Sequence, residues 1–192
     1  MKLRTADIKD ASDESLLDRL ARGDEDAFLA IYRRRQRAVY RYSLHMSGDE
    51  EVAADVVQET FIALLREAGR LDPALGTVQA WLFAVARKQV LRCLTARRRY
   101  LSLEEDSSGE PLVEGCVLEE LEQTQLLERL RDLIPTLPPV YREVLVLCDM
   151  QGLAYEAAAA ITGCPVGTVR SRLHRARALL AGKLKPLVGQ AS

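Results

Sequence analysis

The segment PVGTVRSRLHRAR, residues 165–177, concentrates side chains that bind anions. It carries four arginines and one histidine and no acidic residue. Guanidinium groups pair with phosphate oxygens and with guanine edges, and Thr and Ser hydroxyls hydrogen-bond to either. The chemistry predicted for this segment is non-covalent recognition of a polyanion. The alternative is a solvated helix face whose charges serve only solubility.

The surrounding sequence, residues 155–180, has the layout of a helix-turn-helix, with a short alanine-rich helix, a turn and a second amphipathic helix. Four residues are predicted to hold the two helices at their crossing angle: Ala159, Gly163, Val169 and Leu173. Six side chains of the second helix are predicted to face DNA: Thr168, Arg170, Ser171, His174, Arg175 and Arg177. Because this spacing coincides with a lack of acids, recognition is favoured over solubility.

A second basic segment, residues 77–100, predicts a helix with one apolar and one cationic face. Its predicted buried stripe is Leu82, Ala86, Val90, Cys93 and Leu94. Lys88, Arg92, Thr95 and Arg99 lie opposite, at spacings of four, three and four. Such a stripe could follow a nucleic-acid backbone, and the loop before it, residues 71–77, could hold an unstacked base. An ordinary basic amphipathic helix remains the alternative.

A third segment, residues 51–68, predicts a helix with a partner-binding side. Its predicted core face is Ala53, Ala54, Val57, Phe61, Leu64 and Leu65. Five residues gather on the other side: Asp55, Gln58, Glu59, Ile62 and Arg66. An isoleucine among exposed polar residues is a candidate contact for another protein.

The charges are unevenly distributed, although the net charge is only −1. Residues 73–103 and 157–192 each hold six basic residues and no acid, whereas residues 104–132 hold ten acids and two arginines. Two basic blocks on either side of an acidic connector predict two separate polyanion contacts. Nucleic acid is the favoured partner, with anionic lipid as a weaker alternative.

The propensities predict an all-α fold made of two small helical domains, joined by a flexible acidic linker with Ser, Gly and Pro. The C-terminal domain contains the helix-turn-helix. The predicted helices are 15–22, 24–46, 50–69 and 78–99, then 118–134, 138–150, 155–162 and 167–184.

The sequence contains no pattern typical of a catalytic or metal site. Its four cysteines never form a C-x-x-C pair, and its two histidines are far from them. We therefore expect no catalytic residue, no metal and no cofactor. No apolar run is long enough for a membrane span, so we expect a cytoplasmic protein without membrane insertion.

Together these segments resemble bacterial RNA polymerase sigma factors of the extracytoplasmic-function (ECF) group, in the sigma-70 family. Five stretches carry the resemblance: GDEDAFLAIY at 23–32, AADVVQETFIAL at 53–64, AWLFAVARKQVL and ARRR within 80–99, IPTLPPVYREVLVL at 134–147, and GLAYEAAAAITGCPVGTVRSRLHRAR at 152–177. Their order and spacing make the match specific.

The resemblance implies a division of the chain: a flexible N-terminus at 1–14, a region 2 domain at 15–100, an acidic linker at 101–117 and a region 4 domain at 118–187. The region 4 domain would read the minus-35 promoter element (here the upstream element) as duplex through residues 165–177. The implied minus-ten contacts are Lys88, Arg92, Thr95, Arg97, Arg98 and Arg99. The implied contacts to the polymerase clamp are Asp55, Gln58, Glu59 and Ile62.

The implied partners are core RNA polymerase, through its β′ clamp helices and its β flap, promoter DNA, and an anti-sigma factor. The chain departs from the family pattern at Lys88 and Arg92, where Asn and Asp are usual, and at Ala157 and Ala158, where Glu and Ile are usual. The first pair predicts altered minus-ten recognition, and the second a less tightly packed helix-turn-helix.

Two other classes remain open at this stage. One is a conventional helix-turn-helix regulator whose N-terminal half senses a signal or dimerises. The other is a nucleic-acid-modifying enzyme, which the lack of a carboxylate pair, metal cluster or Cys/His arrangement disfavours.

Overall fold

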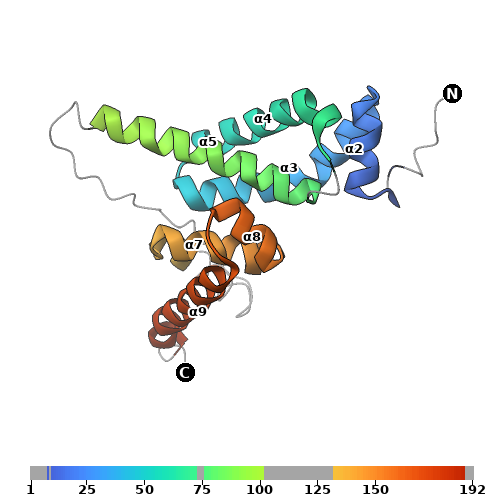
Figure 1. Cartoon of the computed structure of the whole chain (residues 1–192). Helices are drawn as coiled ribbons and strands as arrows, with labels where there is room; N and C mark the ends of the chain where they lie inside the picture. The colour runs from blue at the N-terminus through green and yellow to red at the C-terminus, as the bar shows by residue number, and fades with distance from the viewer. Residues whose placement is uncertain (1–7, 9, 73–75, 102–131, 189–192) are drawn as a thin grey trace. The chain divides into compact units, whose positions relative to one another are not determined.

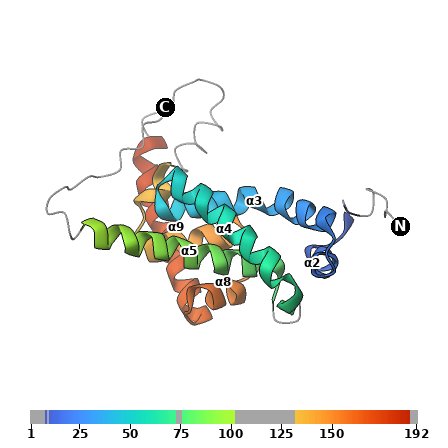
Figure 2. The ribbon, with the colours of Figure 1, turned by 90° about the horizontal axis from the view of Figure 1, so that it is seen from above.

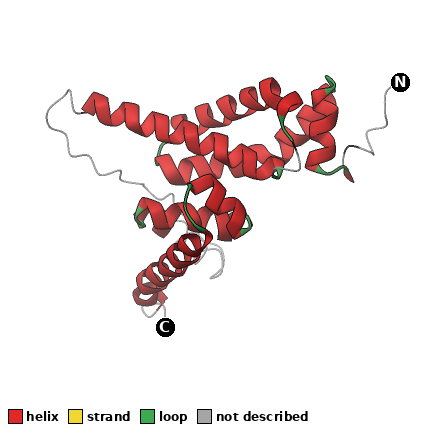
Figure 3. Ribbon diagram, viewed as in Figure 1, coloured by secondary structure: helices red, strands yellow, loops and turns green. Residues whose placement is uncertain are grey.

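The computed structural model describes residues 8, 10–72, 76–101 and 132–188, without the side chains of 97–101 and 185–188. These described residues form helices and turns and include no strand (Figures 1 and 3). They divide into two compact units between Ala96 and Arg97. The predicted all-α class and two-domain organisation are confirmed. The predicted linker lies outside the described residues beyond position 101, and so does the predicted helix 118–134 before position 132.

Unit 1 is made of α2 (Asp13–Ala21), α3 (Glu25–Ser47), α4 (Glu50–Glu67), the 3-10 turn η1 (Ala68–Arg70) and α5 (Val78–Leu101) up to its residue Ala96. Side-chain oxygens of Ser12, Asp24 and Asp49 accept hydrogen bonds from first-turn N–H groups of α2, α3 and α4. Gly48 has a φ of 70°, which lets the chain reverse between α3 and α4. The helix bounds agree with the predicted ones to within two residues.

Aromatic rings join the helices of unit 1, in which α3, α4 and α5 lie side by side (Figure 2). The ring of Tyr42 on α3 lies 5.4 Å from that of Phe83 on α5, and both side chains are buried. The ring of Tyr32 on α3 lies 4.8 Å from that of Phe61 on α4. Edge-to-face contacts of this kind restrict ring orientation, so they fix which faces of α4 and α5 remain outside.

An ion-pair cluster holds α2 against α3. The Asp13 carboxylate, 6% exposed, accepts hydrogen bonds from Arg34 at 3.1 Å and from Arg35 at 2.5 Å. Arg34 also donates to the Ala11 carbonyl at 2.6 Å. With Ser12 as its cap, α2 therefore begins at Asp13, two residues before the predicted start.

Unit 2 is made of η3 (Ile134–Thr136), α7 (Pro139–Leu145), the π-helical turn η4 (Val146–Met150), α8 (Tyr155–Thr162) and α9 (Val166–Val188). α7 and η4 together occupy the predicted helix 138–150. The Arg142 guanidinium donates to the carbonyls of Pro135 and Leu137, which ties the η3 turn to α7. α9 packs against both α7 and α8. The side of α9 that these two helices do not cover is exposed to solvent.

The buried face of α4 differs in phase from the predicted one. Ala54 and Leu65 were predicted in the core, and both are exposed, Leu65 to 50%. Val56 and Thr60 are buried instead. The buried face therefore turns away from Leu65, which joins the outer surface beside Ile62.

Candidate nucleic-acid interface

The helix-turn-helix depends on a tight turn between α8 and α9. Gly163 ends α8 with a φ of 68°, and its N–H donates to the Ala159 carbonyl at 2.9 Å. Pro165 immediately precedes α9, and its carbonyl accepts from the N–H groups of Thr168 and Val169. A residue with a Cβ would be strained at the Gly163 φ, which explains the glycine there.

The predicted inner face of α9 is buried. Val169, Leu173, Ala176 and Leu180 are 0%, 1%, 0% and 6% exposed. On α8, Ala159 is 9% exposed and Ala158 is fully buried, so neither alanine lies at an open gap on the surface. Burial of this stripe fixes the rotation of α9 about its axis and turns the intervening residues outward.

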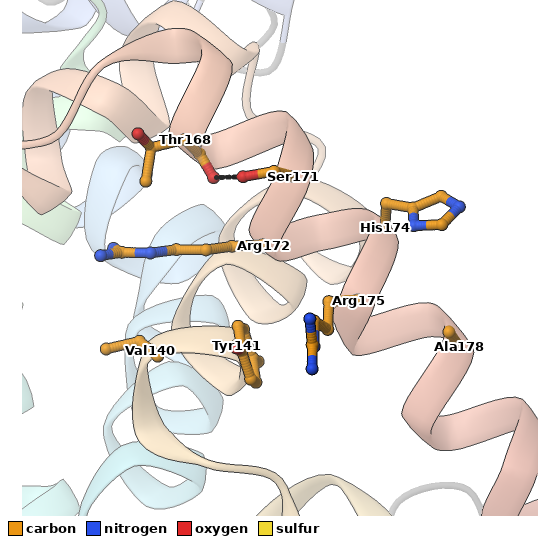
Figure 4. A pocket seen from close by; sticks show the side chains of 8 residues that line it. All are labelled: Val140, Tyr141, Thr168, Ser171, Arg172, His174, Arg175 and Ala178. Carbon is orange, nitrogen blue, oxygen red and sulfur yellow. Dashed lines mark hydrogen bonds between the residues drawn. The ribbon is translucent and has the colours of Figure 1, made fainter.

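Most of the predicted DNA-facing residues lie on the outer side of α9. Arg170, Ser171, His174, Arg175 and Arg177 are exposed, and Thr168 is half-buried. The Ser171 hydroxyl donates to the Thr168 carbonyl at 3.0 Å (Figure 4). All but Arg177, which lies in the fourth turn, occupy the first three turns of the helix, where a recognition helix meets base edges in a major groove.

Arg170 has a contact that the sequence did not predict. Its guanidinium carbon lies 5.8 Å from the centre of the Tyr155 ring, over the ring face. Tyr155 begins α8, so this cation–π contact links the outer face of α9 to the start of the preceding helix. The contact limits the range of orientations that the Arg170 side chain can adopt before it meets a ligand.

Arg177 also has a partner in unit 2. Its Nε donates to one oxygen of Asp149 at 2.8 Å and its Nη2 to the other at 2.6 Å. This two-pronged pairing with a carboxylate raises the pKa of Arg177 above its ordinary value. An Arg177 contact with DNA would therefore require the guanidinium to exchange Asp149 for phosphate.

We expect the Asp149→Asn substitution to tighten binding to duplex DNA that carries the upstream element. The substitution releases Arg177 and removes a carboxylate that repels phosphate. The slope of log affinity against log salt should steepen by about 0.9, the value for one added phosphate contact. Fluorescence anisotropy at several salt concentrations measures this slope.

Glu156→Gln is the matched control for that prediction, because it removes one exposed negative charge from α8 without a described ion pair. Equal slopes for the two variants would show that Arg177 does not exchange partners.

A groove of about 700 Å³ runs between α7 and the outer face of α9. Its lining residues are Val140, Tyr141, Thr168, Ser171, Arg172, His174, Arg175 and Ala178. Arg172 and Arg175 extend toward the α7 side of this groove, whereas the His174 ring projects from α9 in a different direction (Figure 4). Arg175 and His174 therefore reach in different directions from one turn of helix.

The two described thiols of unit 2, those of Cys148 and Cys164, show no arrangement for nucleophilic chemistry. Burial next to Asp149 raises the pKa of the Cys148 thiol to about 11, so the thiol stays protonated at neutral pH. The Cys164 sulfur lies 3.2 Å from the Thr162 hydroxyl and 3.7 Å from the Arg172 guanidinium. Among the residues that the structure describes, no cluster of three His, Cys, Asp or Glu side chains could hold a metal ion.

In unit 1 the predicted cationic stripe lies on the outer side of α5. Lys88, Arg92 and Thr95 are exposed, and Arg92 donates to the Gln89 amide oxygen at 3.0 Å. The side chains of Arg97, Arg98 and Arg99 lie outside the described residues. The opposite side buries Leu82, Ala86 and Val90 as predicted, together with Phe83, whereas Cys93 and Leu94 are only half-buried.

The outer side of α4 combines polar and apolar residues. Asp55, Gln58 and Glu59 are exposed, and Ile62 is half-buried. Leu65, three residues after Ile62, extends this surface with a half-exposed apolar side chain. The spacing of three from Ile62 was the signal that could have placed Leu65 there.

The part of the chain that the structure describes holds no helix both long enough and apolar enough to cross a membrane.

Models of two sequence families match the chain, one in each half. The model of sigma-70 region 2 matches residues 31–100, and that of sigma-70 region 4 matches residues 127–180. The first match covers α4, most of α3 and α5 up to residue 100, and the second covers α7, η4, α8 and α9 up to residue 180.

Curated relatives match most of the chain. The ECF RNA polymerase sigma-E factors of Escherichia coli (strain K12) and Salmonella typhimurium (strain LT2) are 37% identical over 92% of this chain and 96% of their own length. The ECF RNA polymerase sigma factor SigE of Mycolicibacterium smegmatis is 34% identical over 82% of this chain. The chain spans 62% of the length of that relative.

Two solved structures share the fold. The structure of CnrH in complex with the cytosolic domain of CnrY has a TM-score of 0.67 and 28% identity, and it covers 92% of this chain and 99% of its own. The sigma factor RpoE of Bartonella quintana, in complex with the anti-sigma factor NepR, has a TM-score of 0.67 and 26% identity over 78% of this chain and 91% of its own. With both family matches and relatives that match along most of its length, the chain belongs to the sigma-70 family, in the extracytoplasmic-function group.

Proposed function

We propose that this chain is an ECF sigma factor that binds core RNA polymerase and directs it to specific promoters. The observation that carries the proposal is the outer face of α9. It presents a row of arginine, histidine and hydroxyl side chains on a helix-turn-helix whose inner face is buried. Family membership supplies the polymerase as the second partner.

Unit 2 is proposed to read the upstream promoter element as duplex and to contact the β flap of the polymerase. The proposed DNA contacts are Thr168, Arg170, Ser171, His174, Arg175 and Arg177. Of these, Arg170 and Arg175 offer the geometry for guanine edges, because an exposed guanidinium can donate two parallel hydrogen bonds to one base. Arg177 is proposed as a phosphate contact that forms when its guanidinium leaves Asp149.

Unit 1 is proposed to bind the β′ clamp helices through the outer side of α4. Asp55, Gln58 and Glu59 supply polar contacts there, and Ile62 supplies apolar area. The exposure of Leu65 supports this surface, because an apolar pair one helical turn apart gives a partner more area to cover than one isoleucine.

Unit 1 is also proposed to melt and bind the minus-ten element through α5. Lys88, Arg92 and Thr95 are exposed along one side, as contact with a strand requires. Arg97, Arg98 and Arg99 belong to the same proposal by their positions in the sequence. The domain bounds given above, 1–14, 15–100, 101–117 and 118–187, are part of this proposal.

An anti-sigma factor is proposed as the regulator. The structures of two similar proteins, CnrH and RpoE, contain the cytosolic domain of CnrY and the anti-sigma factor NepR, respectively. The proposed role is non-catalytic and cytoplasmic: the chain binds and positions, and the polymerase carries out the chemistry.

Binding measurements distinguish the proposal from a conventional regulator. A sigma factor should form a one-to-one complex with core polymerase and bind promoter DNA weakly alone, with the footprint appearing only in the complex. A dimeric regulator would instead protect a palindrome without polymerase, and that result would overturn the proposal.

The double substitution Lys88→Asn with Arg92→Asp is expected to weaken binding of the polymerase complex to minus-ten DNA and to flatten its salt dependence. Each lost contact to a single-stranded backbone should reduce the salt slope by about 0.7. The measurement is the salt slope of binding to a promoter fragment that is already melted at the minus-ten element. Arg22→Asn with Arg70→Asp makes the same charge change at two other exposed positions of unit 1. An identical slope in both double variants would show that the α5 stripe does not touch phosphate.

A further inference from the structure

A third acid-free basic segment lies in α3, outside the two basic blocks considered so far. Residues 27–48 hold five arginines and no acid. Arg33, Arg37 and Arg41 follow one another at spacings of four, and all three are exposed. A spacing of four places them along one side of a helix, over about 12 Å of its length.

The three arginines of this α3 stripe differ from their neighbours in having no described partner. Within unit 1, Arg19 pairs with Asp24 at 2.7 Å, and Arg34 and Arg35 pair with Asp13. Among the described residues, no hydrogen bond or ion pair involves Arg33, Arg37 or Arg41. Asp13 and Asp24 are therefore paired with other arginines of the unit and not with this stripe.

The stripe faces away from the core of unit 1. The buried residues of α3 include Ile31, Val39 and Tyr42, and Tyr42 contacts Phe83 of α5. The arginines lie on the other side of the helix. The stripe is therefore a surface separate from the residues that join α3 to α5, and a ligand could approach it without disturbing that packing.

We propose that the α3 stripe binds the phosphate backbone of duplex DNA, independently of sequence. Three guanidinium groups about 6 Å apart along a helix form a row of positive charge that can pair with the phosphates of a polyanion. Duplex is preferred over single strand because a duplex has the higher charge density, one charge per about 1.7 Å of axis.

This contact does not depend on reading by α9, and it would hold the chain on DNA that lacks a promoter. Its expected signature is strong salt dependence without sequence preference. Each of the three phosphate contacts should contribute about 0.9 to the salt slope.

The test is binding of the full chain to a duplex of random sequence, measured by fluorescence anisotropy at several salt concentrations. The triple variant Arg33→Gln, Arg37→Gln, Arg41→Gln is expected to reduce the salt slope by about 2 to 3 relative to the parent. The triple variant with lysine at the same positions should keep most of the slope, because lysine also pairs with phosphate. Thermal melting of each variant confirms that it is folded.

Arg22→Gln, Arg66→Gln and Arg70→Gln form the control triple, with the same charge change at exposed positions of unit 1. Equal slopes for the two glutamine triples would overturn the proposal. So would a loss seen on single-stranded DNA and absent on duplex, or full competition by polyglutamate at matched charge, which would indicate an acidic polypeptide. Because the duplex carries no promoter, failure here leaves promoter reading by α9 untouched.

Discussion

Replacing both Arg170 and Arg175 by Ala is expected to weaken binding to the upstream element by about 2–6 kcal/mol. Each arginine that pairs with a guanine edge contributes about 1–3 kcal/mol of discrimination. Arg170 is held over the Tyr155 ring and Arg175 borders the groove beside α7, so both are exposed with part of their orientation already set. The loss corresponds to a fall in affinity of roughly 30-fold to more than 10⁴-fold.

The measurement is footprinting and titration of the polymerase complex on a promoter fragment. Arg22→Ala with Arg70→Ala removes the same charge from unit 1 and controls for general electrostatic attraction. We expect protection of the upstream element to disappear only in the α9 variant. Unchanged protection there would contradict the assignment of α9 as the reading helix.

Leu173→Ala is expected to destabilise unit 2 by about 2–5 kcal/mol. Leu173 is 1% exposed and lies between Val169 and Ala176 on the buried face of α9, so its loss leaves a cavity under the reading helix. The free energy of unfolding, measured by urea denaturation with a probe in unit 2, should fall accordingly. DNA binding should fall with it, because the rotation of α9 depends on this face.

Leu179→Ala is the matched control, since Leu179 lies on the same helix and is 36% exposed. It should change the free energy of unfolding by no more than about 0.5 kcal/mol. Equal effects of the two substitutions would mean that α9 is not seated on its predicted face.

The helix-turn-helix was predictable because its determinants are local. The spacing of Val169, Leu173 and Leu180 fixes one face, and Gly163 supplies the conformation that ends α8. Once this face is buried, the outward position of Arg170 and Arg175 follows from helix geometry alone. The starts predicted for α3 and α4, residues 24 and 50, likewise lie within one residue of the starts in the structure, which Asp24 and Asp49 cap.

The contacts between distant residues were not predictable. Asp149 and Arg177 are 28 residues apart, and no periodicity links the end of η4 to the fourth turn of α9. Asp13 and Arg34 likewise meet only because α2 folds onto α3. Pairings of this kind depend on how helices pack, which the pattern of one helix does not contain.

The sequence interpretation missed two features, the buried face of α4 and the exposed arginines of α3, and each has a physical reason. α4 has more apolar residues than one helix face can bury, so its sequence alone does not determine which of them lie in the core. In the structure Val56 and Thr60 are buried, and Ala54 and Leu65 are exposed. On α3, the arginines were overlooked because Asp24, Glu25 and Asp26 precede them and balance the local charge. The structure separates the arginines that are paired from those that are not.

Run-off transcription tests the central claim most directly. The chain, core RNA polymerase and a library of genomic fragments are combined, and the transcripts are sequenced to find their start sites. We expect discrete transcripts only when both proteins are present, with a shared upstream element whose mutation abolishes them. Transcripts that are the same with core polymerase alone, or start sites without a shared upstream element, would contradict the account.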